Sequence, residues 1–186
     1  MRSDPGEREE PPLCVDLDGT LVATDTLRVS LGLLARRRPW LLLPAAACVV
    51  GGRAAFKAYV ATCILPDAAT LPWRTTVVDF LRAERARGRR LILATAADHR
   101  IAACAAQHLG IFDAVIATEG GDNRKGAAKL AAIRNLLGDK EFDYIGDSLD
   151  DLPLFHAARK VFLVAPGGAL LDRVRRGRTV DRVFPD

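Results

Sequence analysis

Several short apolar segments of this chain are followed by side chains that can do chemistry. An Asp-Leu-Asp-Gly-Thr motif (16–20) follows one segment, Thr95 ends another, and Gly-Asp-Ser-Leu-Asp-Asp (146–151) ends a third. Lys125 stands at the start of the helix expected before the third segment. Carboxylates serve as nucleophiles, proton donors or metal ligands, whereas hydroxyl and ammonium groups bind anions. We expect these groups to converge on one edge of the fold.

The apolar segments predict the strands that would position these side chains. These segments are continuous rather than alternating, which is typical of strands whose two faces are both covered by helices. They are Leu13–Val15, Leu91–Leu93, Ala114–Ile116, Tyr144–Ile145 and Val161–Val164. Segments with helical periodicity lie between them, so we predict an α/β fold with a Rossmann-like, doubly wound parallel sheet. In such sheets ligands bind beyond the carboxyl ends of the strands.

One segment interrupts this alternation directly after the first strand. Residues 24–70 are helical in character, with a helix expected from Asp25 or Thr26 to about Arg37 and another over 52–63. We therefore predict a small helical cap at 24–70, inserted into an α/β core of 12–23 and 71–186. The polar, proline-rich residues 1–11 are expected to be a disordered lead-in without a secretory signal.

The four motifs, taken in order, resemble those of the haloacid dehalogenase (HAD) superfamily. They are DLDGT, the strand-terminal Thr95, the helix-initiating Lys125 and GDSLDD, and the resemblance covers Leu13 to about Pro166. A single motif of this kind is a weak signal, whereas the ordered set is specific. The resemblance implies the HAD fold, a cap that sets specificity, and phosphoryl-transfer chemistry that depends on Mg²⁺.

The resemblance also implies roles for the carboxylates. Asp16 would attack phosphorus and form an aspartyl-phosphate, and Asp18 would act as the general acid and base. Mg²⁺ would be held by the Asp16 carboxylate, the Asp18 backbone carbonyl and Asp147, with Asp151 beside the metal. Asp151 is preferred to Asp150 because the GDxxxD spacing selects it. Asp18 favours phosphoryl transfer, since dehalogenases lack this carboxylate.

The remaining site residues would bind the phosphoryl group. Thr95 would donate a hydrogen bond to it, with Thr20 and Ala96 as further phosphate-binding candidates, and Lys125 would offset its charge. Lys129 is the alternative to Lys125, one turn later and on nearly the same side of the helix. Lys125 is preferred because it opens the helix and because its separation from Asp147 fits the family better.

These roles imply a Mg²⁺-dependent phosphohydrolase that acts on phosphate monoesters. A phosphotransferase or mutase is the first alternative, and a non-catalytic regulatory module of a membrane enzyme is the second. The intact set of four motifs argues against the second alternative. Substrate contacts are expected from the cap, with Asp25, Arg53 and Lys57 as candidates.

A narrower resemblance concerns the segments 20–27, 51–61, 85–102 and 124–130. Together they resemble the phosphatase domain that precedes a UbiA-type prenyltransferase in some bacterial membrane proteins, and residues 176–186 resemble the linker before that membrane domain. The resemblance implies a stand-alone version or the excised soluble half of such a protein. It also implies a lipid-linked or prenyl-transfer-related phosphate ester as substrate and a UbiA-type prenyltransferase as partner.

Charge and hydropathy limit the other partners. The net charge is +4, and the arginines cluster at 36–38, 82–90 and 173–178, which we interpret as solvated helix faces. No RRM-like or zinc-finger-like pattern supports a nucleic-acid partner. The apolar stretch 40–50 is too short to span a bilayer, which needs roughly 20 residues. We expect it to pack within the cap or against the core, with peripheral contact to a membrane surface as the alternative. The cysteine spacings suit a reducing cytoplasm, so the chain is expected there, with the inner face of the membrane as a further location.

Overall fold

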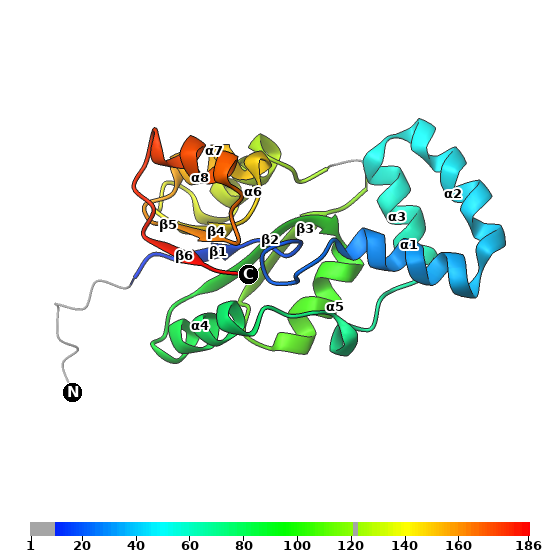
Figure 1. The fold of residues 1–186 in the computed structure, drawn as a ribbon, viewed down its shortest axis with the longest axis horizontal. Helices are drawn as coiled ribbons and strands as arrows, with labels where there is room; N and C mark the ends of the chain where they lie inside the picture. The colour runs from blue at the N-terminus through cyan, green and yellow to red at the C-terminus, as the bar shows by residue number, and fades with distance from the viewer. Residues whose placement is uncertain (1–9, 121–122) are drawn as a thin grey trace.

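The core of the computed structural model, which describes residues 10–120 and 123–186, is a six-stranded parallel sheet with the strand order β3-β2-β1-β4-β5-β6 (Figure 1). The expected lead-in at 1–11 lies largely outside the described residues. The strands are β1 (Leu13–Val15), β2 (Leu91–Asp98), β3 (Ala114–Thr118), β4 (Asp143–Gly146), β5 (Val161–Val164) and β6 (Arg182–Phe184). The predicted α/β fold with a doubly wound parallel sheet is confirmed.

Helices cover both faces of this sheet (Figure 1). The helices are α4 (Thr75–Ala86), α5 (His99–Leu109), α6 (Ala127–Leu137), α7 (Leu152–Ala157) and α8 (Gly168–Arg175). Val15 and Leu93 point toward α4 and α5, whereas Cys14 and Ile92 point toward α6, α7 and α8. Alternate residues of each strand therefore enter opposite cores, which is why the strand sequences contain continuous apolar segments.

The strand order reverses at β1, which pairs with β2 on one side and with β4 on the other. Connections leaving the carboxyl ends of β1 and β4 run in opposite directions, so a crevice opens between them. Asp16 follows β1 and Asp147 follows β4, at this crevice. The topology therefore brings together two carboxylates that are 131 residues apart (147 − 16).

The C-terminal residues differ from the sequence expectation. The segment 176–186, which resembles a linker, includes β6, and β6 pairs in parallel with β5. Phe184 is buried and packs near Phe80, and the guanidinium group of Arg182 lies 4.4 Å from the centre of the Phe184 ring. A three-residue strand at a sheet edge with only one buried side chain leaves too little periodicity in the sequence to be predicted.

The cap projects from the sheet on the side of the carboxyl ends of the strands (Figure 1). It contains α1 (Thr26–Arg37), α2 (Leu42–Cys48) and α3 (Arg53–Cys63), joined by the short 3-10 turns η1 (Pro39–Leu41) and η2 (Val49–Gly51). A further turn, η3 (Ala68–Thr70), leads back to α4. Asp25 caps α1 by accepting a hydrogen bond from the Arg28 amide at 3.1 Å. The two helices expected in this segment are therefore present.

The apolar stretch 40–50 does not pack as expected. It forms η1, α2 and η2, and Ala45 is its only buried residue. Helix α2 packs against α3. The residues on its other side, such as Leu43 and Ala47, are exposed and are not covered by any part of the described chain. Among the described residues, no helix is long and apolar enough to cross a bilayer.

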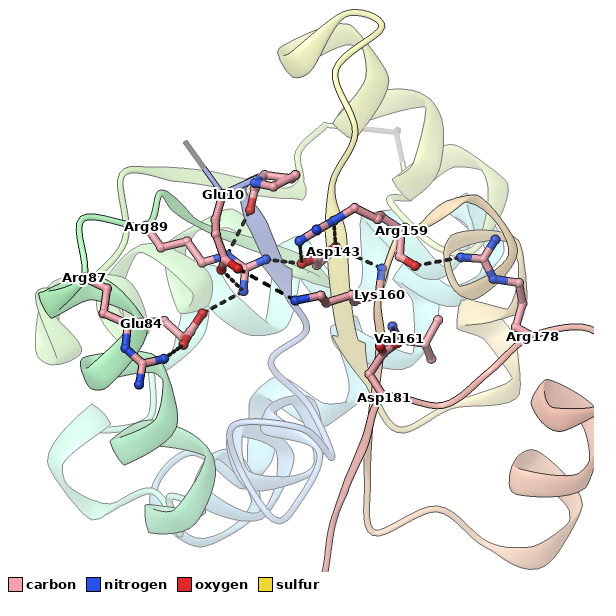
Figure 2. A network of polar contacts seen from close by, with 11 residues as sticks. Glu10, Glu84, Arg87, Arg89, Asp143, Arg159, Lys160, Val161, Arg178 and Asp181 are labelled. Carbon is pink, nitrogen blue, oxygen red and sulfur yellow. Dashed lines mark hydrogen bonds and ion pairs between the residues drawn. The ribbon is translucent and has the colours of Figure 1, made fainter. Parts of the chain in front are cut away.

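A buried network of ion pairs and hydrogen bonds connects the amino ends of β2, β4 and β5 (Figure 2). Arg89, only 4 % exposed, donates to Glu84 at 2.7 Å and also pairs with Asp143 at the start of β4. Arg159 donates to both oxygens of Asp143, at 2.9 and 2.7 Å. Arg89 therefore departs from the solvated helix face expected for the arginines at 82–90. The network lies at the end of the sheet opposite the crevice.

Candidate active site

The turn after β1 fits closely against Asp147. The hydroxyl group of Thr20 is buried and donates a hydrogen bond to Oδ1 of Asp147 at 2.8 Å. Gly19 has a φ of +78°, and a Cβ atom at this position would lie 2.1 Å from Oδ2 of Asp147. The motif therefore needs glycine at 19 both for its backbone conformation and for the close approach. Thr20, a phosphate-binding candidate, is placed to orient Asp147 through this hydrogen bond.

Three carboxylates meet in the crevice. Asp16, Asp147 and Asp151 each offer an oxygen atom, and these atoms lie within 4.8 Å of one another. Burial raises the pKa of Asp16 to about 7 and that of Asp147 to about 6, and the neighbouring carboxylates add to both effects. Oδ2 of Asp151 is buried and accepts no hydrogen bond from the described residues. Oxygen ligands of this charge and one unsatisfied acceptor fit a hard divalent cation such as Mg²⁺.

The lysine that contacts the expected nucleophile is Lys129. Its Nζ lies 3.0 Å from Oδ1 of Asp16 and 2.9 Å from Oδ1 of Asp151, and the side chain is 3 % exposed. Burial disfavours the ammonium group, but the two carboxylates outweigh that effect and raise the pKa of Lys129. Nζ also lies 3.0 Å from the hydroxyl oxygen of Tyr144.

Lys125, which the sequence favoured, lines the cavity described below but pairs with Asp150 and not with Asp16. It forms an ion pair of 2.8 Å with Asp150, and both side chains are substantially exposed. Helix α6 begins at Ala127 with Gly126 as its cap, so Lys125 precedes the helix, whereas Lys129 lies in its first turn and faces the sheet. The sequence interpretation placed the start of the helix about two residues too early.

Tyr144 was not singled out from the sequence. Its hydroxyl group lies 3.0 Å from Oδ1 of Asp151, and the ring packs against Phe155 in the core. It helps to fix Asp151 and Lys129 in place. A tyrosine in an apolar strand is ordinarily a core residue, so no sequence signal distinguished this one.

Asp18 joins the core to the cap. Its Oδ1 accepts a hydrogen bond from the backbone amide of Thr26, the first residue of α1, at 2.7 Å. Burial raises the pKa of Asp18, which favours the protonated form expected of a general acid. The same contact fixes the position at which the cap leaves the core.

Thr95 and Ala96 lie inside β2, which continues to Asp98 beyond the expected strand end. Oγ1 of Thr95 accepts a hydrogen bond from the Ala97 amide at 3.0 Å, which leaves the hydroxyl proton available to an acceptor in the crevice. The carbonyl oxygen of Ala96 accepts a hydrogen bond from Nζ of Lys57 at 2.6 Å. Both residues line the cavity described next.

A cavity of about 480 Å³ lies between the cap and the core. Asp16, Asp18, Thr95, Lys129 and Asp147 line it from the core. The cap contributes two apolar side chains, Leu27 and Phe56, and two cations, Arg53 and Lys57. Asp25 also lines the cavity, although its carboxylate caps α1. The structure thus brings together all the expected carboxylates, with Lys129 deeper than Lys125.

Comparison with known proteins agrees with this geometry. The family model for haloacid dehalogenase-like hydrolases matches residues 13–156, which is most of the chain. The chain belongs to this family. A relative from Sinorhizobium fredii (strain NBRC 101917 / NGR234), the uncharacterized protein y4nM, is 35% identical over 164 residues. That match covers 88% of this chain but only 32% of the relative, so the chain spans about a third of the relative's length.

Solved structures share the fold of this chain. A protein of unknown function from Bordetella pertussis Tohama I superposes with a TM-score of 0.73 at 18% identity, covering 95% of this chain and 98% of its own. A substrate-bound phosphoserine phosphatase superposes with a TM-score of 0.63 at 12% identity, covering 97% and 95%. At these identities the likeness shows the fold alone.

Proposed function

We propose that this family member is a Mg²⁺-dependent phosphohydrolase that cleaves phosphate monoesters through an aspartyl-phosphate on Asp16. The observation that carries the proposal is the setting of Asp16 at the end of β1. One carboxylate oxygen is 3.0 Å from Nζ of Lys129, and Asp147 and Asp151 offer oxygen atoms on the same side of the crevice. An anionic nucleophile can approach an anionic phosphate only where such positive charge compensates both.

The proposed reaction has two steps, each balanced by a proton carried by Asp18. An oxygen of Asp16 bonds to phosphorus, the ester oxygen leaves, and protonated Asp18 supplies its proton. Asp18 then accepts a proton from a water molecule that attacks phosphorus, which releases inorganic phosphate and restores Asp16. Burial of Asp18, which favours its neutral form, supports its role in the first step.

The other site residues bind Mg²⁺ or the phosphoryl group, or compensate negative charge. Mg²⁺ would be held by Asp16, Asp147 and the backbone carbonyl of Asp18, with Asp151 beside it, and would supply positive charge at the phosphoryl group. Lys129 takes the charge-compensating role expected for Lys125, because Lys129 contacts Asp16. Thr95 donates its hydroxyl proton to a phosphoryl oxygen, and Ala96 lines the phosphate end of the cavity. Thr20 orients Asp147 through its hydrogen bond.

The substrate is proposed to carry an organic group beneath the cap. Leu27 and Phe56 offer it apolar surface, and Arg53 and Lys57 offer positive charge to a second anionic group. Burial lowers the pKa of Lys57, so an anion at this point would compensate a desolvation cost. These features support a phosphorylated metabolite with further negative charge, and a prenyl- or lipid-linked ester is the substrate class that we favour.

The wider context proposed for the protein follows from its motif resemblance. A UbiA-type prenyltransferase domain is the proposed partner, and the cytoplasm, at the inner face of the membrane, is the proposed location. The support is the resemblance of segments 20–27, 51–61, 85–102 and 124–130 to phosphatase domains that accompany such enzymes. Co-purification of this chain with a UbiA-type prenyltransferase expressed in the same cell tests the pairing.

Phosphate release from a panel of phosphate esters, with and without Mg²⁺, tests the activity. Wild-type turnover that requires Mg²⁺ and is abolished by Asp16→Asn is the expected result. Isomerised sugar phosphate without phosphate release would identify a mutase instead. If the folded wild type turns over no ester and beryllium fluoride with Mg²⁺ fails to raise its melting temperature, the enzymatic proposal is wrong and a regulatory module remains.

A further inference from the structure

The outer end of the cap exposes four large apolar side chains. Trp40 is 66 % exposed, Leu43 80 %, Val49 56 % and Val50 94 %. We call these four residues the cap tip. Every other large apolar side chain of the described residues is less exposed than any of them. Soluble proteins scatter exposed apolar residues singly, so a cluster within eleven residues of sequence indicates a surface that another phase or molecule covers.

Helix α2 is apolar on both of its sides. Its inner side carries the buried Ala45 and the half-buried Leu42 and Cys48 and packs on α3. Leu43 and the alanines at 46 and 47 are exposed on the other side of α2, and Val49 and Val50 are exposed in η2, which follows it. A surface helix of a soluble protein normally places polar residues on its outer side. No polar side chain other than Cys48 occurs in α2.

The charged residues between the two ends of the cap are all basic. Residues 26–66 contain no Asp or Glu, and their basic residues are Arg28, Arg36, Arg37, Arg38, Arg53 and Lys57. This stretch therefore carries +6, and the whole cap (24–70), which also contains Asp25 and Asp67, carries the entire net charge of +4. Arg36, Arg37 and Arg38 are exposed and directly precede the cap tip. No acidic side chain among the described residues forms an ion pair with any of the three.

We propose that the cap tip is a docking surface for a bilayer that contains anionic phospholipids. Trp40 and the aliphatic side chains would enter the interfacial region, where an amphipathic aromatic ring is favoured. Arg36, Arg37 and Arg38 would contact the lipid phosphates. The cap lies at one end of the molecule (Figure 1), so it can meet a flat surface without hindrance from the core.

A second copy of this chain fits the surface less well. Contact between two identical cap tips would bring together two basic stretches (26–66) of +6 each, and like charges at short range repel. An anionic bilayer supplies the opposite charge and an apolar interior at once. The proposal concerns binding alone and does not rest on the phosphatase activity.

The test is co-sedimentation of the full chain with vesicles, in the absence of any substrate. Vesicles of phosphatidylcholine with phosphatidylglycerol should bind the wild type, pure phosphatidylcholine should bind it far less, and high salt should release it. Leu43→Gln with Val50→Gln, or Arg36→Gln with Arg37→Gln, should each weaken binding about tenfold or more. The emission of Trp40 should shift to the blue on binding, and Trp40→Phe should remove that shift.

Matched controls lie on α8 and α6. Arg173→Gln with Arg175→Gln removes the same charge from another exposed basic cluster, and Leu136→Gln removes an exposed leucine elsewhere. Both should bind vesicles as the wild type does. The proposal fails if the wild type stays in the supernatant at low salt, or if the controls lose binding equally. It also fails if the chain forms dimers that Leu43→Gln with Val50→Gln dissociates while no form binds vesicles, because the surface then joins two copies.

Discussion

Nζ of Lys129 lies 3.0 Å from Oδ1 of Asp16 and 2.9 Å from Oδ1 of Asp151, so one buried ammonium group bridges the proposed nucleophile and a second carboxylate. The two carboxylates raise the pKa of Lys129, so it stays charged over the whole working range of pH. This fixed positive charge stands where negative charge must gather during phosphoryl transfer. The site is therefore preorganised before any substrate arrives.

Replacing the bridging lysine should reduce activity far more than replacing its neighbour. We expect Lys129→Met to lower kcat by about 10²–10³-fold, the range seen when one preorganised electrostatic group is lost. Lys125→Met should lower it by less than about threefold, because its exposed pair with Asp150 adds little. Phosphate release measures both, and circular dichroism shows whether each variant is folded. A larger loss in the Lys125 variant would restore the sequence-based assignment.

The lysine shows what the sequence does and does not determine. Lys125 and Lys129 are four residues apart, so a helical pattern puts them on nearly the same side. Only the start of α6 at Ala127 separates a residue in the preceding turn from one facing the sheet. Helix starts are the least predictable feature of a sequence, whereas the strand-end motifs around Asp16 and Asp147 depend on local spacing alone.

The packing of one element against another also could not be predicted from the sequence. The apolar stretch 40–50 was expected to pack within the cap or against the core, because Pro44 interrupts an amphipathic helix, yet most of its side chains are exposed. Arg89 looked like one arginine in an exposed basic cluster, but Glu84 and Asp143 surround it from other elements. Both outcomes depend on which surfaces meet in three dimensions. Strands β1 to β5 and most helices, in contrast, follow from periodicity and end residues.

Gly19 should tolerate no side chain. Gly19→Ala would place a Cβ atom 2.1 Å from Oδ2 of Asp147, so that carboxylate must move away from the crevice. We expect Mg²⁺ affinity and activity to fall by at least about tenfold, measured by titration calorimetry and phosphate release. Gly88→Ala is the control, because Gly88 has a similar φ of +83° and open space around it. That variant should lose about 1 kcal/mol of stability but keep its Mg²⁺ affinity.

The affinity for Mg²⁺ should rise with pH. Burial and neighbouring carboxylates raise the pKa of Asp147 to about 6, so most of this side chain is protonated at pH 5 and ionised at pH 7. Protons compete with the metal for the same oxygen atoms, so affinity should be about tenfold or more weaker at pH 5 than at pH 7. Calorimetric titration of the folded protein at several pH values measures this.

The variant Asp147→Asn tests whether protonation of Asp147, and not of another group, causes the dependence of Mg²⁺ affinity on pH. The variant should bind Mg²⁺ more weakly at every pH and should show a shallower dependence on pH, since one titrating ligand is gone. An equal slope in wild type and variant would show that Asp147 is not the group whose proton competes with the metal.

The buried network at the amino ends of the strands should matter for stability and not for catalysis. Arg89→Met leaves the carboxylates of Glu84 and Asp143 buried with fewer partners, and breaking a buried pair typically costs about 3–5 kcal/mol. Chemical denaturation should show this loss, whereas kcat of the folded fraction should change little. The network (Figure 2) lies at the amino ends of β2 and β4, whereas the crevice lies at the carboxyl ends of the strands. Arg87→Met removes a mostly exposed partner of the same Glu84 and should change stability only slightly. If the two variants were equally stable, the network would not contribute to folding in the way that its burial implies.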